Sequence, residues 1–494
     1  MFWTAYTVAH IAASAAVTLH VLLRRIGPIS ASAWIGLAWL APGAGAALYL
    51  LLGINRIERR GLRLRRGRVA APDQPACCAI APAHLMPLER AATHITGRAL
   101  LAGNTAEALQ HGEATYPAML AAIEGAKHSI ALNSYIFRND TIGRRFIAAL
   151  ADAQARGVAV RVLIDGVGGG YFNSGSYRHL KRLGVPAARF MHSHLPWRMP
   201  LLNLRSHKKL LVVDGRRGFT GGVNIGDENL ESPERPLPRP LPRPLRRRLA
   251  RGLPRALARI PVPRLRRRGI RDTHFRLEGP VVAQVMAAFT EDWGFTTGEV
   301  LQGPLWFPVI APAGEAFARV ATSGPDHDIE RIKLLMMSAV TSARRRVRIV
   351  TPYFLPDDPL ASTLALAALR GVKVEIIVAE RCDHILLDWA MRDGLLAMAR
   401  AGCAVLWSAP PFNHSKLLTV DGAWCMLGSA NWDMRSLRLN FELNVELLDP
   451  AVTARIDALI DATPTRPSTL RELLARPIPV RLRDATARLL LPYL

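Results

Sequence analysis

The chain has 494 residues, enough for two to four domains. Half of its residues (50%) are hydrophobic, which excludes an intrinsically disordered protein and favours a membrane-spanning segment. Its formal net charge is +25, from 64 Lys and Arg against 39 Asp and Glu. Five scattered cysteines predict neither a disulfide framework nor a zinc site, and they indicate a reducing compartment for most of the chain.

The first predicted elements are two uncharged apolar runs, residues 3–23 and 30–53. As a helix, each is long enough to cross a bilayer core of about 30 Å. The first run lacks the basic start and the small-residue cleavage site of a signal peptide. We therefore predict a transmembrane hairpin over residues 1–55 and a basic juxtamembrane linker over residues 56–110. Two buried helices of a soluble protein are the alternative.

Two features refine the predicted hairpin. Pro42 and Gly43 are expected to kink the second helix or to make it re-entrant. Arginines predict the orientation, because positively charged segments stay cytoplasmic. Two of them lie between the runs, whereas seven follow the second run, and these seven also suit an anionic lipid surface: Arg56, Arg59, Arg60, Arg63, Arg65, Arg66 and Arg68.

Residues 111–300 and 301–494 are predicted to form two repeated α/β units. Each should contain a strand, a helix and a second strand that opens with R-G-V-x-V, an order typical of α/β layers. The expected elements are residues 129–137, 143–154 and 156–165 in the first unit, and residues 347–355, 360–369 and 370 onward in the second.

A segment rich in proline and arginine, residues 233–268, interrupts the first unit. It carries thirteen arginines against one acid, Glu234. Prolines recur every second or third residue at its front, which excludes a helix or a central strand there. Leucines spaced by four further on permit a basic amphipathic helix on a membrane. We favour a solvated flexible insertion, and nucleic-acid binding is the third alternative.

The strongest signal is the motif H-x-K-x4-D, which occurs twice. Each copy is followed by a glycine-containing segment that ends in an asparagine. Because histidine and lysine are rare in this chain, two chance copies in matching contexts are implausible. The candidate residues are His207, Lys209, Asp214 and Asn224 in the first copy, and His414, Lys416, Asp421, Ser429 and Asn431 in the second.

The spacing of this motif has a chemical logic. A histidine and a lysine two residues apart point to the same face of a strand, and the apolar run after them fits a buried strand. Two facing copies then supply two imidazoles and two ammonium groups. One imidazole can attack the phosphorus of a phosphodiester while the other protonates the leaving oxygen. The lysines and asparagines can stabilise the charged oxygens, so no metal and no other cofactor is expected.

These motifs resemble those of the phospholipase D superfamily, and the chain as a whole resembles the bacterial cardiolipin synthases. The resemblance covers nearly the whole chain, including the N-terminal apolar hairpin. It implies two pseudo-twofold related α/β units with mixed β-sheets. Beyond the two motifs it is carried by YIF at 135–137, TGGVNIGDE at 220–228, TPYFLP at 351–356 and GSANWDMRSLRLNFELN at 428–444.

The resemblance also implies roles for individual residues. The reaction would pass through a phosphohistidine, with His207 as the nucleophile and His414 as the general acid. Glu442 and its counterpart Asp272 would each orient a histidine by accepting a hydrogen bond from the ring nitrogen that does not react. The aspartates of the two motifs are expected to hold their geometry and charge balance rather than to transfer protons.

The implied function is phosphatidyl transfer from one phosphatidylglycerol to a second, which makes cardiolipin and releases glycerol. The implied partners are phosphatidylglycerol, other anionic phospholipids and the bacterial cytoplasmic membrane, with the catalytic units in the cytoplasm. The rival enzymes are a phospholipase D-type hydrolase and a transferase for another lipid donor or alcohol. A nuclease or nucleic-acid-binding protein agrees with the charge alone, and no aromatic stacking platform accompanies it.

Overall fold

The computed structural model describes residues 2–24, 28–50, 82–192, 204–230, 269–325 and 328–489. The chain divides into an N-terminal unit, residues 1–64, and a large unit, residues 65–494. The Pro/Arg-rich insertion, residues 233–268, and the predicted basic cluster after residue 55 lie outside the described residues.

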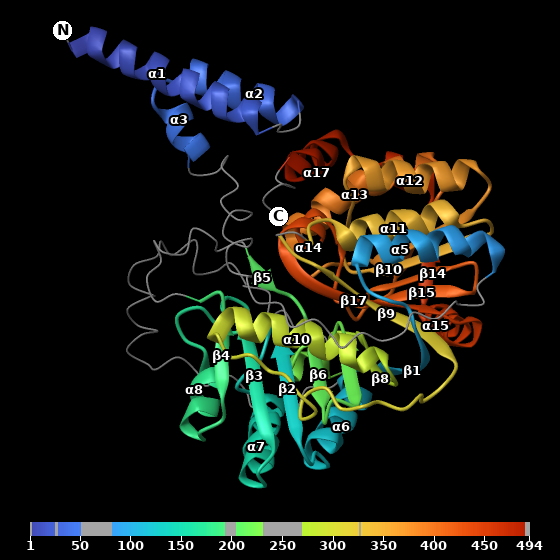
Figure 1. Ribbon diagram of the computed structural model, residues 1–494. Coiled ribbons are helices and arrows are strands. Elements are labelled where there is room, and N and C mark those ends of the chain that lie inside the picture. The colour runs from blue at the N-terminus through green and yellow to red at the C-terminus, as the bar shows by residue number, and fades with distance from the viewer. Residues whose placement is uncertain are drawn as a thin grey trace, which may run out of the picture. The chain divides into compact units, whose positions relative to one another are not determined.

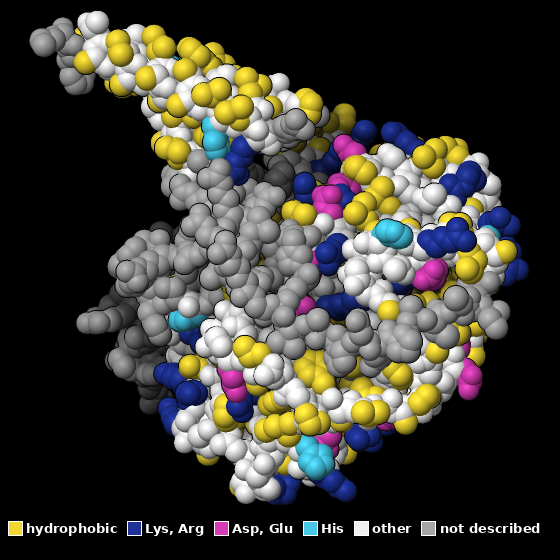
Figure 2. Space-filling view, viewed as in Figure 1, with side chains coloured by type: hydrophobic (Ala, Val, Ile, Leu, Met, Phe, Trp, Pro, Cys, Tyr) yellow, Lys and Arg dark blue, Asp and Glu magenta, His cyan; other side chains and the backbone are white. Residues whose placement is uncertain are grey.

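The N-terminal unit consists of α1 (Phe2–Leu23), α2 (Pro28–Leu40) and α3 (Ala44–Leu48). Some of its polar side chains turn inwards: the Ser14 hydroxyl donates to the carbonyl oxygen of Ala38 at 2.8 Å, and His20 Nδ1 lies 2.7 Å from the Tyr49 hydroxyl. Apolar side chains cover the outside of these helices (Figure 2). Polar groups inside and apolar groups outside are the distribution expected of helices in lipid.

The second predicted membrane helix differs from the expectation. The run 30–53 is not one helix, because the helical structure is interrupted at residues 41–43 between α2 and α3. Pro42 has no N–H to continue the helix, and Gly43 has a φ of 74°. Among the described residues, α1 alone is long and apolar enough to cross a membrane, and α2 has 13 residues.

One large mixed sheet organises the rest of the chain. Its strand order is β18-β13-β12-β10-β14-β15-β17-β9-β1-β8-β7-β6-β2-β3-β4. The first half contributes β1 (Leu101–Gln110), β2 (Ser129–Ser134), β3 (Ala159–Asp165), β4 (Ala187–Phe190), β6 (Leu210–Val213), β7 (Arg217–Gly221) and β8 (Thr273–Glu278). The second half contributes β9 (Ala316–Ser323), β10 (Arg346–Thr351), β12 (Lys373–Ala379), β13 (Ala404–Ser408), β14 (Leu417–Val420), β15 (Trp424–Gly428), β17 (Asn440–Leu448) and β18 (Thr465–Pro467).

The two halves repeat each other. The order β1-β8-β7-β6-β2-β3-β4 in the first half corresponds to β9-β17-β15-β14-β10-β12-β13 in the second, and β1 and β9 join the halves as an antiparallel pair. Each half contains the predicted strand–helix–strand unit with parallel strands: β2, α7 (Thr141–Ala155) and β3, then β10, α12 (Asp358–Leu369) and β12. The predicted internal repeat of two α/β units is therefore confirmed.

Helices cover both faces of this sheet (Figure 1). On one face, α10 (Val281–Thr297) and α15 (Pro450–Ala462) share a core with strands of both halves. This core includes Leu163 and Leu210 of the first half and Leu417 and Val445 of the second. On the other face each half has its own core, under α6 (His111–Glu124) and α7 in the first and under α11 (Arg331–Ser342), α12 and α13 (Ile385–Arg400) in the second. The shared core makes the two halves one body.

The predicted linker over residues 56–110 extends too far. Its last part forms α5 (Met86–Thr96) and then β1 at the centre of the sheet. Helix α5 lies beside α11 of the second half (Figure 1). Leu88 and Ala92, spaced by four, place one apolar face of α5 in the core of that half.

Candidate active site

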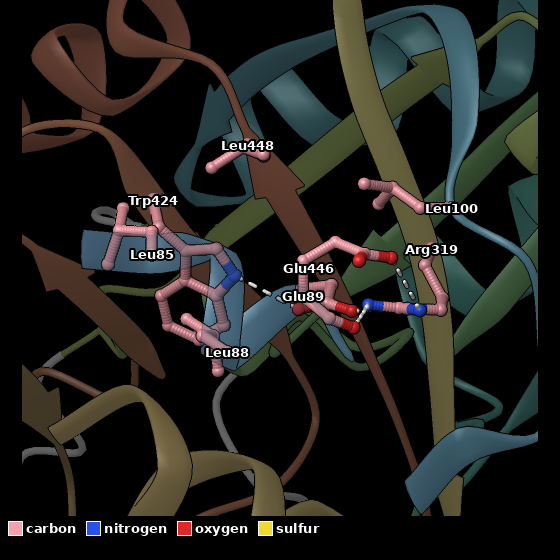
Figure 3. A pocket seen from close by; sticks show the side chains of 8 residues that line it. All are labelled: Leu85, Leu88, Glu89, Leu100, Arg319, Trp424, Glu446 and Leu448. Atoms are coloured by element: carbon pink, nitrogen blue, oxygen red, sulfur yellow. Dashed lines mark hydrogen bonds and ion pairs between the residues drawn. The ribbon is translucent and has the colours of Figure 1, made fainter. Parts of the chain in front are cut away.

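Two cavities of very different size lie among the described residues of the large unit. The small one, about 10 Å³, lies beside α5, where the buried Arg319 contacts Glu446 and the indole of Trp424 donates to Glu446 at 2.9 Å (Figure 3). It has room for about one water molecule. The large one, about 1010 Å³, is lined by residues of both halves, so it is the candidate substrate site.

Backbone pairing between the halves builds this large cavity. Strand β5 (Arg205–Ser206) leaves the first half and pairs in parallel with the start of β17. The pairing continues as the His207 N–H donates to the carbonyl of Phe441 at 2.9 Å. In the second half, the His414 N–H donates to the carbonyl of Arg271 at 2.7 Å. Each motif histidine is thus anchored by the backbone of the opposite half.

The orienting carboxylates are exchanged in the same way. Nδ1 of His207 lies 3.0 Å from the carboxylate of Glu442, and Nδ1 of His414 lies 2.7 Å from the carboxylate of Asp272. Both histidines line the cavity. When Nδ1 donates to a carboxylate, Nε2 remains as the nitrogen that can react. Resemblance singled out the two carboxylates, whereas their exchange between the halves follows only from the tertiary structure.

The motif lysines are buried next to the histidines. Lys209 Nζ donates to the carbonyl of His207 at 2.7 Å, and Lys416 Nζ lies 2.9 Å from His414 Nδ1 and also donates to the His414 carbonyl. Burial lowers the pKa of Lys209 to about 7 and that of Lys416 to about 8. The motif histidines and lysines precede β6 and β14 rather than lying within those strands, which is a small correction to the expected strand position.

The electrostatics of the two histidines differ. Burial and then the charges of Lys209 and Lys416 lower the pKa of His207 well below its ordinary value. Burial also lowers the pKa of His414, but there Asp272 opposes the shift. Burial raises the pKa of Glu442 to about 7. For Asp272, burial would raise the pKa, yet the charges of Lys416 and His414 outweigh it and lower the value. His414 therefore has the stronger counter-ion.

The motif aspartates do not line the cavity. Asp214 and Asp421 occupy the turns β6–β7 and β14–β15, with φ of 52° and 53°, and each precedes a glycine of positive φ. The Asp214 carboxylate accepts from three successive backbone N–H groups, residues 127–129, and the Asp421 carboxylate accepts from residues 344–346. The four residues between the lysine and the aspartate are thus the strand β6 or β14. The aspartate lies in the turn after that strand and binds backbone N–H groups at the start of β2 or β10.

The remaining predicted site residues surround the histidines. Asn224 and Asn431 line the cavity. The Ser429 hydroxyl donates to Glu442 at 2.6 Å, so it contacts the carboxylate that His207 also contacts. A Cβ atom at Gly222 would lie 2.1 Å from an oxygen of Asp272, which explains the glycine before Asn224 in the first copy.

Three further residues at the site received no role from the sequence: Tyr135, Arg205 and Lys208. Tyr135 packs its ring 4.9 Å from the ring of His207, and its hydroxyl accepts from Arg205 at 2.9 Å. Lys208, between the motif residues, forms a buried ion pair with Asp292 of α10 at 2.8 Å. The R-x-H spacing could have indicated Arg205, but no sequence signal connects Lys208 with a helix more than eighty residues away.

Comparisons with known proteins agree with this geometry. A family model described as cardiolipin synthase, PLD-like domain, matches residues 119–234 and 336–463. A cardiolipin synthase of Geobacillus thermodenitrificans is 32% identical over 94% of this chain and 89% of its own length. The major cardiolipin synthase of Bacillus subtilis is 31% identical over 79% of this chain and 76% of its own length. A phosphatidylserine synthase of Haemophilus influenzae shares the fold, with a TM-score of 0.60 and 15% identity over 82% of this chain and 100% of its own.

The family match falls on both halves of the sheet and contains both motif histidines. Identity above 30% over most of the chain extends the match to the regions outside those two segments. The chain therefore belongs to the bacterial cardiolipin synthase family of the phospholipase D superfamily, a family of phosphatidyltransferase enzymes.

Proposed function

We propose that this protein is a membrane-bound cardiolipin synthase that transfers a phosphatidyl group from one phosphatidylglycerol to another and releases glycerol. One observation carries the proposal: two histidines, each held by a carboxylate of the opposite half, line a single cavity of about 1010 Å³. Membership of the cardiolipin synthase family supports phosphatidylglycerol as the substrate.

The first step forms a phosphohistidine. His207, whose pKa is lowered, is neutral and attacks the phosphorus of the donor through Nε2. The bond between phosphorus and the glycerol oxygen breaks, and His414 gives its proton to that oxygen. Asp272 supports the imidazolium form of His414 before the transfer. Lys209 and Lys416, with the amides of Asn224 and Asn431, stabilise the negative oxygens in the transition state.

The second step reverses the proton transfer. His414, now neutral, takes the proton from a hydroxyl group of the acceptor phosphatidylglycerol, whose oxygen attacks the phosphorus. The bond between phosphorus and His207 breaks, cardiolipin forms, and His414 is again protonated. Glu442 and Ser429 keep the His207 ring in place through both steps.

The N-terminal helices supply the membrane attachment in this proposal. Helix α1 is long enough to span a bilayer, and large apolar side chains such as Trp3, Leu19 and Leu23 are exposed on it. The arginines that follow residue 55 favour a cytoplasmic catalytic unit. The lipid substrates would then come from the cytoplasmic leaflet.

The test uses purified full-length protein in vesicles of phosphatidylglycerol, with lipid products identified by mass spectrometry. The wild type should form cardiolipin and glycerol in equal amounts. His207→Asn and His414→Asn should both abolish turnover. The His414→Asn variant alone should accumulate a phosphatidyl adduct, located on His207, when the donor carries a good leaving group.

Two results would overturn parts of this proposal. Phosphatidic acid as the main product would make the protein a hydrolase. A covalent adduct on His414 in the His207→Asn variant would reverse the roles of the two histidines.

A further inference from the structure

The cavity contains a cationic wall that the two chemical steps above do not use. Arg205 and Arg435 both line it, together with the reacting residue His207. Arg205 lies on β5, and Arg435 lies on α14 (Met434–Arg438), which immediately precedes β17. Because β5 pairs with the start of β17, the two arginines approach each other from opposite halves.

Arg205 is held in a fixed position relative to His207. The two residues are two apart in an extended segment, so they point to the same side at a separation of about 6.5–7 Å along the chain. Arg205 Nη1 donates to the hydroxyl of Tyr135, whose ring faces His207 at 4.9 Å. A three-carbon glycerol bridge between two phosphates can span such a separation.

The charge of Arg205 lacks a direct counter-ion among the described residues: no carboxylate lies within ion-pair distance of it, and its buried Nε has no acceptor. Asp165 acts on it through space, but that carboxylate accepts hydrogen bonds from the backbone N–H groups of Val167, Gly168 and Ser206. Burial, and then the charge of Arg205, lower the pKa of Arg435. The two neighbouring guanidinium groups therefore bring two positive charges to the cavity wall beside His207.

We propose that Arg205 and Arg435 bind the phosphate of the acceptor phosphatidylglycerol while its glycerol hydroxyl reaches the phosphohistidine. This inference rests on the proposed function and assigns the second lipid to a defined subsite. A guanidinium fork suits a phosphodiester anion because it can donate two parallel hydrogen bonds. The hydroxyl oxygen forms the new bond to phosphorus, the bond to His207 breaks, and the hydroxyl proton passes to His414.

A comparison of two soluble acceptors tests this phosphate subsite separately from the reacting groups. Glycerol offers only the attacking hydroxyl, whereas glycerol 3-phosphate also offers a phosphate three carbons away. With phosphatidylglycerol as donor and both acceptors isotopically labelled, so that transfer to glycerol can be followed, the wild type should prefer glycerol 3-phosphate in kcat/KM by about tenfold or more, as expected for a charge-assisted bidentate contact. The ratio between two acceptors is insensitive to the fraction of folded enzyme.

Arg205→Gln and Arg435→Gln should each lose most of this preference in the ratio of the two kcat/KM values, and Arg205→Lys should recover part of it. Arg217→Gln is the control, because Arg217 forms an exposed ion pair with Glu278 on β7 and β8, outside the cavity, and should keep the full preference. Equal losses for both acceptors, or an unchanged ratio, would overturn the subsite. A wild type that forms no cardiolipin from phosphatidylglycerol in the same vesicles would instead reject the proposed function.

Discussion

The lysines of the two motifs are buried in the site with lowered pKa values. Each ammonium is buried beside a histidine, so burial favours loss of its proton near neutral pH. Catalysis needs these groups as cations, because their charge stabilises the oxygens of the phosphodiester. The histidine that attacks must be neutral. The two requirements restrict activity to a narrow range of pH.

We expect a bell-shaped dependence of kcat/KM on pH for head-group exchange. The rate should fall as the pH rises, because His414, whose pKa is lowered, loses the proton that it gives to the leaving oxygen. The two cations are also lost as the pH passes the pKa values of Lys209 and Lys416, about 7 and about 8. The acid limb should lie below the ordinary histidine pKa of about 6.5, because the pKa of His207 is lowered. Initial rates between pH 4 and 10 check this, and an alkaline limb that begins only above pH 9 would contradict it.

The motif aspartates should affect stability rather than chemistry. Burial would raise the pKa of Asp421, but backbone hydrogen bonds from residues 344–346 and a contact with His84 lower it. A lowered pKa contributes stability above the unfolded value of about 3.9 and loses it as the pH falls through the folded value. Asp421→Asn should therefore cost about 1–3 kcal/mol at pH 7, and less below pH 4.

Denaturant unfolding of Asp421→Asn at several pH values measures this loss. Asp214→Asn is the matched variant, since it occupies the same turn in the first half. Both should keep a kcat per folded molecule within a few-fold of the wild type. A normally stable Asp421→Asn variant with a severely reduced kcat would give Asp421 a direct part in the reaction.

At the scale of elements, a buried ion pair connects the first motif to α10. The side chains of Lys208 and Asp292 are each 1% exposed. Removing one partner leaves the other charge buried and unpaired, which costs about 3–5 kcal/mol. Lys208→Met should therefore destabilise the large unit strongly, and Lys208→Met combined with Asp292→Leu should recover much of the loss.

Thermal or urea unfolding of the wild type, the two single variants and the double variant gives the coupling energy of the pair. Arg217→Met serves as the comparison, because the Arg217–Glu278 pair is 49% and 37% exposed and should contribute about 0–1 kcal/mol. Additive effects of the Lys208 and Asp292 substitutions would show that the two charges do not stabilise each other.

The Pro/Arg-rich insertion is predicted to be dispensable for folding. The chain returns to the place it left, since the Ile270 N–H donates to the carbonyl of Glu228 at 2.8 Å. Deleting residues 233–264 keeps 231–232 and 265–268 as a connection. The deletion variant should keep its melting temperature and its turnover in detergent. It should bind anionic vesicles less tightly and with a weaker dependence on salt, whereas an unfolded product would make the segment part of the fold.

For the whole molecule, the central prediction is the side of the membrane. We expect the large unit to be cytoplasmic, from the arginines that follow the second apolar run. Ala148, on the exposed face of α7, is a suitable reporter position. In a variant without its own cysteines, Ala148→Cys should react with a membrane-impermeant maleimide only after the cells are lysed. Labelling in intact cells would place the unit outside.

Local patterns in the sequence were sufficient for the elements and the chemistry. The repeated strand–helix–strand unit follows from hydrophobic periodicity, and the two H-x-K-x4-D motifs follow from residue type and spacing, because both depend on neighbours within about ten positions. The same reasoning placed residues 86–110 in a linker, because α5 and β1 gain their stability from α11, β8 and β9, which are far away in the sequence.

Only the tertiary structure decided how the two halves share one site. The exchange of Glu442 and Asp272 between the halves, the parallel pairing of β5 with β17 and the proximity of Arg205 to Arg435 all depend on contacts across the interface. No local pattern encodes such contacts, because each half could form its own sheet without them. The sequence alone thus predicted the reacting groups, and the packing of the two halves determined which carboxylate orients which histidine.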